Sequence, residues 1–223
     1  DAADASQGGL RIVAGPSLTT TLIDALLMGY CGSPLNRIGA SQNSRGPKRW
    51  DFPLYIPAGT RLGVQAGGNQ TSSDVFVIIK LYGGAGIPRE RVGSAVTTYG
   101  AAGVGGGVTI TPGASGNEDD AWVEITASTS RDHFCVVPSF QVTGDTTTNN
   151  RAIAVDIGIG AAGAEEQIAE SYWFFTDSIE SMEGPINWMP TFVDIPADTR
   201  LSMRASNSGT NDGGYSGVLH CVS

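Results

Sequence analysis

The chain is poor in charged residues, cysteine and histidine. Of its 223 residues, 16% are charged, three are cysteine and two are histidine. Cys31, Cys135 and Cys221 are odd in number and widely spaced, so they predict neither a disulfide framework nor a CxxC metal site. We expect each to be a small buried hydrophobic residue.

The chain also lacks a surplus of positive charge and long apolar runs. The formal net charge of −9 argues against nucleic-acid binding, because a phosphate-tracking surface needs a surplus of Lys and Arg. No stretch approaches the roughly 20 apolar residues of a membrane span, and no basic-then-apolar signal segment stands at the start. We therefore expect a soluble protein with neither a nucleic-acid nor a membrane partner. Because the chain begins with Asp1, we also expect processing or a preceding portion.

No catalytic motif is present. His133 follows a turn-like stretch and is expected to be a solvated loop residue, whereas His220 adjoins Cys221 on the last predicted strand. Adjacent strand residues point to opposite faces, so these two do not form a nucleophile pair. There is no G-x-S-x-G elbow, and the glycines at 103–107 lack the βαβ context of a phosphate cradle. We predict a protein that is not an enzyme and has no cofactor.

Two acidic clusters, 118–120 and 165–166, lack the alternating ligands of a calcium loop, so no metal site is predicted. A pair of carboxylates for glycoside cleavage remains a minor hypothesis, since such groups meet only in space. Its candidates are Glu124, Asp156 and Asp194.

What the chain does contain is an internal repeat. The segment from Trp50 to Leu62, with Ile-Pro-Ala-Gly-Thr-Arg-Leu at its end, returns from Trp188 to Leu201 as Ile-Pro-Ala-Asp-Thr-Arg-Leu. A self-match of this kind indicates that one supersecondary unit was duplicated. The chain is therefore predicted to hold two related domains.

Each copy predicts a turn followed by a strand. Pro fixes φ, and Gly59 or Asp198 tolerates a left-handed backbone better than most residues. Residues 61–66 and 200–205 then alternate apolar and polar side chains, as half-buried strands do. A polar run and a return strand complete a hairpin in each copy. The first return strand, 75–82, is apolar on both faces and suits a central strand, whereas the second, 215–222, is weaker.

The glycine-rich composition and many short strands predict an all-β fold of two tandem antiparallel β-sandwich domains, jelly-roll-like, the first of them incomplete. Residues 19–28 fit a short helix or a strand. We assign domain 1 to 1–92, a Gly-rich connector and first strand to 93–120, and domain 2 to 121–223. Domain 1 lacks counterparts of some domain 2 strands, so either the protein is longer or a neighbouring chain completes the domain.

Aromatic residues cluster in domain 2. Consecutive aromatics on a strand cannot all face one core, so some contact a second sheet, a partner subunit or a ligand. The residues we expect at a subunit or ligand contact are Trp173, Phe175, Trp188 and Phe192.

Several tracts are similar to structural proteins of tailed-bacteriophage virions. They are Thr98–Gly100 with the glycines that follow, Ala121–Thr129, Val155–Gly163, and Ile195–Leu201 with its copy Ile56–Leu62. The resemblance implies a β-sandwich in a head decoration, spike or tail fibre, with no catalytic residues to transfer.

The leading hypothesis is therefore a non-enzymatic virion component, located in the extracellular particle, whose partners are further copies of itself and other virion proteins. The alternative is a carbohydrate-binding module that uses the same aromatics to bind host glycans.

Overall fold

The computed structural model describes residues 8–18, 20–27, 49–68, 77–83, 92–101, 107–112, 121–142, 151–169, 172–176, 182–183, 187–208 and 215–223. Within these ranges the regular structure is β throughout and no helix occurs, so no described helix could cross a membrane. Apart from one short parallel pair and one isolated parallel bridge, the strands pair antiparallel. The prediction of an all-β, antiparallel β-sandwich fold is confirmed.

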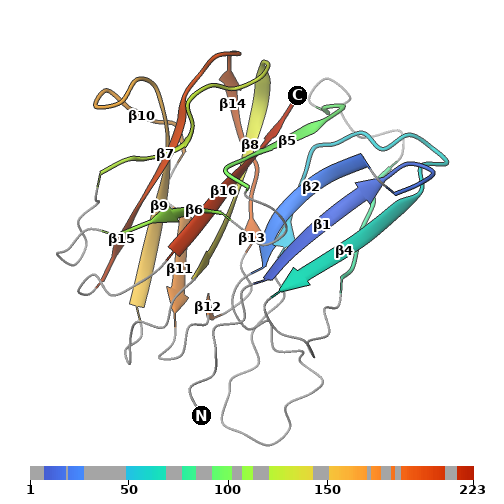
Figure 1. Ribbon diagram of the computed structural model, residues 1–223, viewed down its shortest axis with the longest axis horizontal. Helices are drawn as coiled ribbons and strands as arrows, with labels where there is room; N and C mark the ends of the chain where they lie inside the picture. The colour runs from blue at the N-terminus through green and yellow to red at the C-terminus, as the bar shows by residue number, and fades with distance from the viewer. Residues whose placement is uncertain are drawn as a thin grey trace, which may run out of the picture.

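Two sheets form the sandwich (Figure 1). The six-stranded sheet has the order β12-β11-β9-β15-β7, with β10 paired to β9. Its strands are β7 (Val123–Thr126), β9 (Arg151–Ile159), β10 (Glu166–Gln167), β11 (Tyr172–Thr176), β12 (Met182–Glu183) and β15 (Leu201–Asn207).

The five-stranded sheet has the order β14-β8-β16-β5, with β6 also paired to β16. Its strands are β5 (Val96–Tyr99), β6 (Val108–Ile110), β8 (His133–Val142), β14 (Thr191–Ile195) and β16 (Tyr215–Val222). Both described strands of the segment 93–120 thus join this sheet.

The core lies between these two sheets. Side chains of β7, β9 and β15 meet side chains of β8, β16 and β6 in one cluster, which includes Ile125, Ile153, Val155, Ile157, Leu201, Met203, Phe140, Leu219 and Ile110. The sheets approach so closely at Gly217 that a Cβ there would lie 2.9 Å from the Met203 sulfur. Glycine permits this close approach because a larger residue would force the buried Met203 and Ile110 side chains to move.

A third, three-stranded sheet has the order β2-β1-β4, with β1 (Gly8–Ala14), β2 (Thr20–Leu27) and β4 (Leu62–Gly68). It stands beside the sandwich in Figure 1, in blue and teal, and β2 lies near β5, β8 and β16. The alternatives left open for residues 19–28 are resolved in favour of a strand. The division into domains at 92 and 120 stays a prediction.

The two copies of the repeat meet at their first residues. β3 (Arg49–Trp50) pairs in parallel with β13 (Asn187–Trp188), so Trp50 stands opposite Trp188 in register. The duplicated blocks then diverge into different sheets, the first into β4 and the second into β15.

The predicted turns are confirmed. Gly59 has φ 80° and Asp198 has φ 63°, both left-handed. The first turn closes by the Thr60 N–H to the Pro57 carbonyl at 3.1 Å, as a turn with positive φ at its third residue does. The second is held from outside, because the Asp198 N–H donates to the Thr129 carbonyl at 2.9 Å and its carboxylate accepts from the Ser128 hydroxyl at 3.1 Å.

Three expectations about strands were wrong. Residues 77–83 form no strand and are largely exposed, so 75–82 is not a central strand over its described part. β16, expected to be weak, is buried along its whole length. It also forms no hairpin with β15, since β15 pairs with β7 and β9 while β16 pairs with β5, β6 and β8 in the opposite sheet. The residues that had indicated a weak strand, Ser216, Gly217 and His220, are all buried in β16.

Replacing Gly59 by Ala should destabilise the fold by about 1 kcal/mol, because the left-handed backbone strains a residue with a Cβ although no atom lies within 4 Å. Gly59→Asn should cost less. Gly83→Ala, which adds a Cβ in open space without positive φ, is the control and should cost nothing. Urea unfolding measures all three, and equal losses for Gly59→Ala and Gly83→Ala would contradict the turn assignment.

Candidate functional site

The described part of the predicted contact surface lies on β14, an edge strand of the five-stranded sheet. Phe192 is 47% exposed, and its ring stacks on Phe134 of β8 with centroids 6.4 Å apart. Met189, just before β14, is 56% exposed. We call Phe134, Met189 and Phe192 the β14 surface. A stacked aromatic pair at a sheet edge has the chemistry of a protein contact or of a stacking platform for a flat ligand.

The other three predicted contact residues lie on short strands. Trp173 and Phe175 belong to β11, opposite Ala154 and Ala152 of β9, and Trp188 belongs to β13. Their backbones are described, but the positions of their side chains lie outside the described part of the structure. The structure therefore brings Trp188 beside Trp50 through the backbone and leaves the contact role of all three a prediction.

A second exposed apolar surface was missed by the sequence interpretation. Ile78 is 82% exposed, and Ile79, Leu81 and Tyr82 are exposed as well. Their run of apolar residues had indicated burial, because hydrophobic patterning reports what a strand would bury and not whether a partner is present. One signal in the sequence could have revealed this exposed surface. The first copy of the repeat has, upstream of Trp50, no counterparts of the strands that flank β16 in the second copy.

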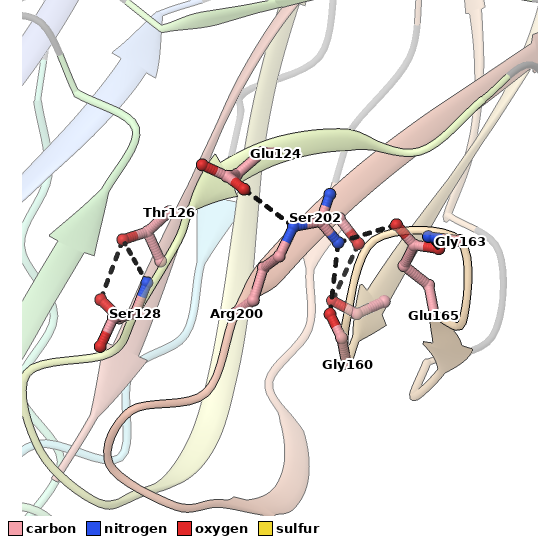
Figure 2. A network of polar contacts seen from close by, with 9 residues as sticks. Glu124, Thr126, Ser128, Gly160, Gly163, Glu165, Arg200 and Ser202 are labelled. Carbon is pink, nitrogen blue, oxygen red and sulfur yellow. Dashed lines mark hydrogen bonds and ion pairs between the residues drawn. The ribbon is translucent and has the colours of Figure 1, made fainter.

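The best-defined polar cluster surrounds Arg200, at the end of the repeated block (Figure 2). Its Nε donates to Glu124 of β7 at 2.8 Å, and its Nη1 donates to Glu165 at 2.7 Å and to the Gly160 carbonyl at 3.3 Å. Glu165 also accepts from the Gly163 N–H at 2.9 Å. The guanidinium thus fastens β7 and the loop after β9 to the start of β15.

Glu165 is held in its charged form. Burial raises its pKa, but hydrogen bonds from its own backbone N–H, from Arg200 and from the Gly163 N–H outweigh this, and the pKa lies below the usual range for glutamate. The cluster is a structural clamp in which one guanidinium binds two carboxylates.

A second arginine serves the same sheet. Arg204 of β15 donates from Nε and Nη2 to Asp156 of β9 at 3.1 and 3.0 Å, and its guanidinium lies 4.4 Å from the centroid of the Trp122 ring. Gly158 leaves room for that ring, since a Cβ there would lie 2.8 Å from it. Two candidate carboxylates of the glycosidase hypothesis, Glu124 and Asp156, thus bind different arginines, and the third, Asp194, is exposed on β14.

His133 is not a solvated loop residue, as the sequence had suggested, but is 3% exposed on β8. Its Nε2 lies 3.0 Å from the Tyr99 hydroxyl, which also accepts from the Ser130 N–H at 2.8 Å. Burial, together with the nearby Arg131 charge, lowers the His133 pKa. The charged residues 131–132 just before it had indicated a solvated loop, although His133 is the first residue of a buried strand.

His220 is fully buried on β16. Its Nδ1 lies 2.9 Å from the Thr98 hydroxyl, and the Phe52 ring packs edge-on against it at 5.5 Å. Burial lowers its pKa to about 3. Cys135 and Cys221 are free and buried, as predicted, whereas Cys31 lies outside the described residues. Burial raises the pKa of both described thiols. These groups are therefore neutral at physiological pH.

Across the described ranges, no group of three or more His, Cys, Asp or Glu side chains is placed to hold a metal ion.

Comparison with known proteins finds distant structural similarity and no sequence match. No family model and no curated protein matches the chain. Among solved structures, it is similar to one described as infectious bursal disease virus Gx strain, with 14% identity and a TM-score of 0.27, and covers 96% of its own length and 52% of that chain. A second, of the Gt strain, has 12% identity, a TM-score of 0.29 and the same coverage. The chain spans about half the length of these structures, and at such TM-scores the likeness carries no functional argument.

Arg200→Met should lower the unfolding temperature by several degrees, because Glu165 would keep a nearly buried charge without its partner. Adding Glu165→Gln to that variant should restore part of the loss. The control is Arg49→Met, which removes an exposed pair with Asp51 and should change little. A double variant no more stable than Arg200→Met alone would contradict the clamp.

The buried His220 predicts acid sensitivity. Below its ordinary pKa of about 6.5, the unfolded chain takes up a proton that the folded chain binds only near pH 3, so stability present above pH 6.5 falls with decreasing pH. We expect a loss of up to roughly 1.4 kcal/mol per pH unit in this window. Urea titrations at several pH values should show a shallower slope for His220→Gln; an unchanged slope would refute the assignment.

Proposed function

We propose that this chain is a non-enzymatic structural component of a virus particle, a capsid decoration or a spike or fibre part, that assembles through apolar surfaces of its β-sandwich. The observation that carries the proposal is the β14 surface. A stacked aromatic pair and Met189 stand at the edge of a rigid sheet, where a partner can bury them without rearranging the core.

Two further features support this role. Arg200 and Arg204 form ion pairs that tie the strands of the six-stranded sheet together, which suits a structural scaffold. The tracts around Thr98, Trp122 and Ile195 resemble tailed-bacteriophage virion proteins, in which such sandwiches are structural.

The exposed Phe192 ring also favours a second candidate, a module that stacks host glycans on the same surface. The two roles differ in what the ring contacts. A saturable ligand on a glycan array, lost in a Phe192 variant, would favour the glycan module over the structural role.

Phe192→Ser should reduce incorporation of the protein into particles about tenfold or more, equivalent to about 1.4 kcal/mol of lost contact, while leaving its unfolding temperature nearly unchanged. Quantitative mass spectrometry of purified particles measures incorporation. Tyr55→Ser is the matched control, since Tyr55 is a similarly exposed aromatic, at 59%, on another segment. Equal incorporation of the Phe192 variant and the wild type would count against the proposal.

A further inference from the structure

The outer edge of β4 lacks a partner within the described chain. β4 pairs with β1 on one side, whereas β15, its counterpart in the second copy, lies between β9 and β7. Natural proteins protect open edges with charged residues or proline. Residues Leu62–Gly68 contain neither, and Val64 is 41% exposed on the sheet face. The β4 edge therefore lacks the features that protect an open edge, as expected of an edge that pairs with another strand.

A strand-forming segment lies exposed in the same chain. Residues 77–82, Val-Ile-Ile-Lys-Leu-Tyr, consist of β-branched, aromatic and other apolar residues around one charge, Lys80. Ile78 is 82% and Leu81 64% exposed, and the segment pairs with no described strand. Exposed segments of this composition pair readily with other chains.

The internal repeat shows what such a segment does when its partners are present. Residues 77–82 follow β4 as β16 follows β15. β16 is buried throughout and is hydrogen-bonded on both sides, to β8 and to β5 and β6. The first copy supplies a segment of the same kind that has no such neighbours among the described strands.

We propose that residues 77–82 of one copy of this chain add as a strand to the outer edge of β4 in a second copy. Each copy then offers one strand and accepts one, so the exchange closes with two-fold symmetry. Charge permits the contact: although the chain carries a net charge of −9, neither 62–68 nor 77–82 contains an acidic residue. Two copies thus meet without opposing carboxylates.

This inference rests on the assembly role proposed above and identifies its first partner as the chain itself. It uses β4 and residues 77–82, and it is independent of the β14 surface. Particle incorporation and dimer formation can therefore fail separately, and a monomeric wild type that still enters particles would refute the exchange alone.

The test is the mass of the full chain in solution, measured by size-exclusion chromatography with light scattering. The wild type should have twice the chain mass of 23.1 kDa. Ile79→Pro removes a backbone donor and should yield a monomer, whereas Ile79→Thr keeps a β-branched residue and should retain the dimer.

Leu81→Lys provides a second disruption that leaves the backbone intact, and it should weaken dimerisation at least tenfold. Its control is Tyr55→Lys, at a comparably exposed site outside the segment. A monomeric wild type at all concentrations, or an Ile79→Pro protein of unchanged mass, would overturn the proposal. Protection of 77–82 from hydrogen exchange in a monomer would also overturn it, since the segment would then pair within its own chain.

Discussion

The burial of β16 on both faces is the constraint on which the rest of the described structure depends. One face meets β15 across the sandwich, where Gly217 admits the Met203 side chain. The other presents His220 to Phe52, on the segment that leads to β4. β8, β5 and β6 all pair with β16. Without β16, these three strands would lose their shared hydrogen-bonding partner, and the sandwich core would lose one of its sides. Charge cannot be tolerated in such a strand, and its histidine is accordingly held neutral.

The same repeated block produces two different environments. In the second copy Leu201 and Met203 are fully buried, and Arg200 is clamped by Glu124 and Glu165. In the first copy the corresponding Val64 is exposed, and Arg61 reaches only the Pro16 carbonyl among its described contacts. The local turn and strand are common to both because they arise from short-range backbone preferences. The difference in burial arises from which strands are available nearby.

This difference between local preferences and distant partners explains which features of the fold could be predicted from the sequence. The left-handed Gly59 and Asp198, the strands after them and the all-β class follow from local chemistry, and the structure confirms them. Burial of His133 and the central position of β16 depend on partners far along the chain, which periodicity does not report. Among the exposed apolar residues, the sequence singled out Phe192 through its aromatic neighbours but missed Ile78 and Leu81. A run that is apolar on both faces has the same pattern whether it is buried within one chain or between two.

On the proposal made above, the second copy of the repeat is completed within the chain and the first by another molecule. Hydrogen exchange measured residue by residue over a range of protein concentrations tests it most directly. We expect the amides of β16 to be protected equally at every concentration, while those of β4 and residues 77–82 gain protection as concentration rises. Protection of β4 and 77–82 that is independent of concentration would contradict it.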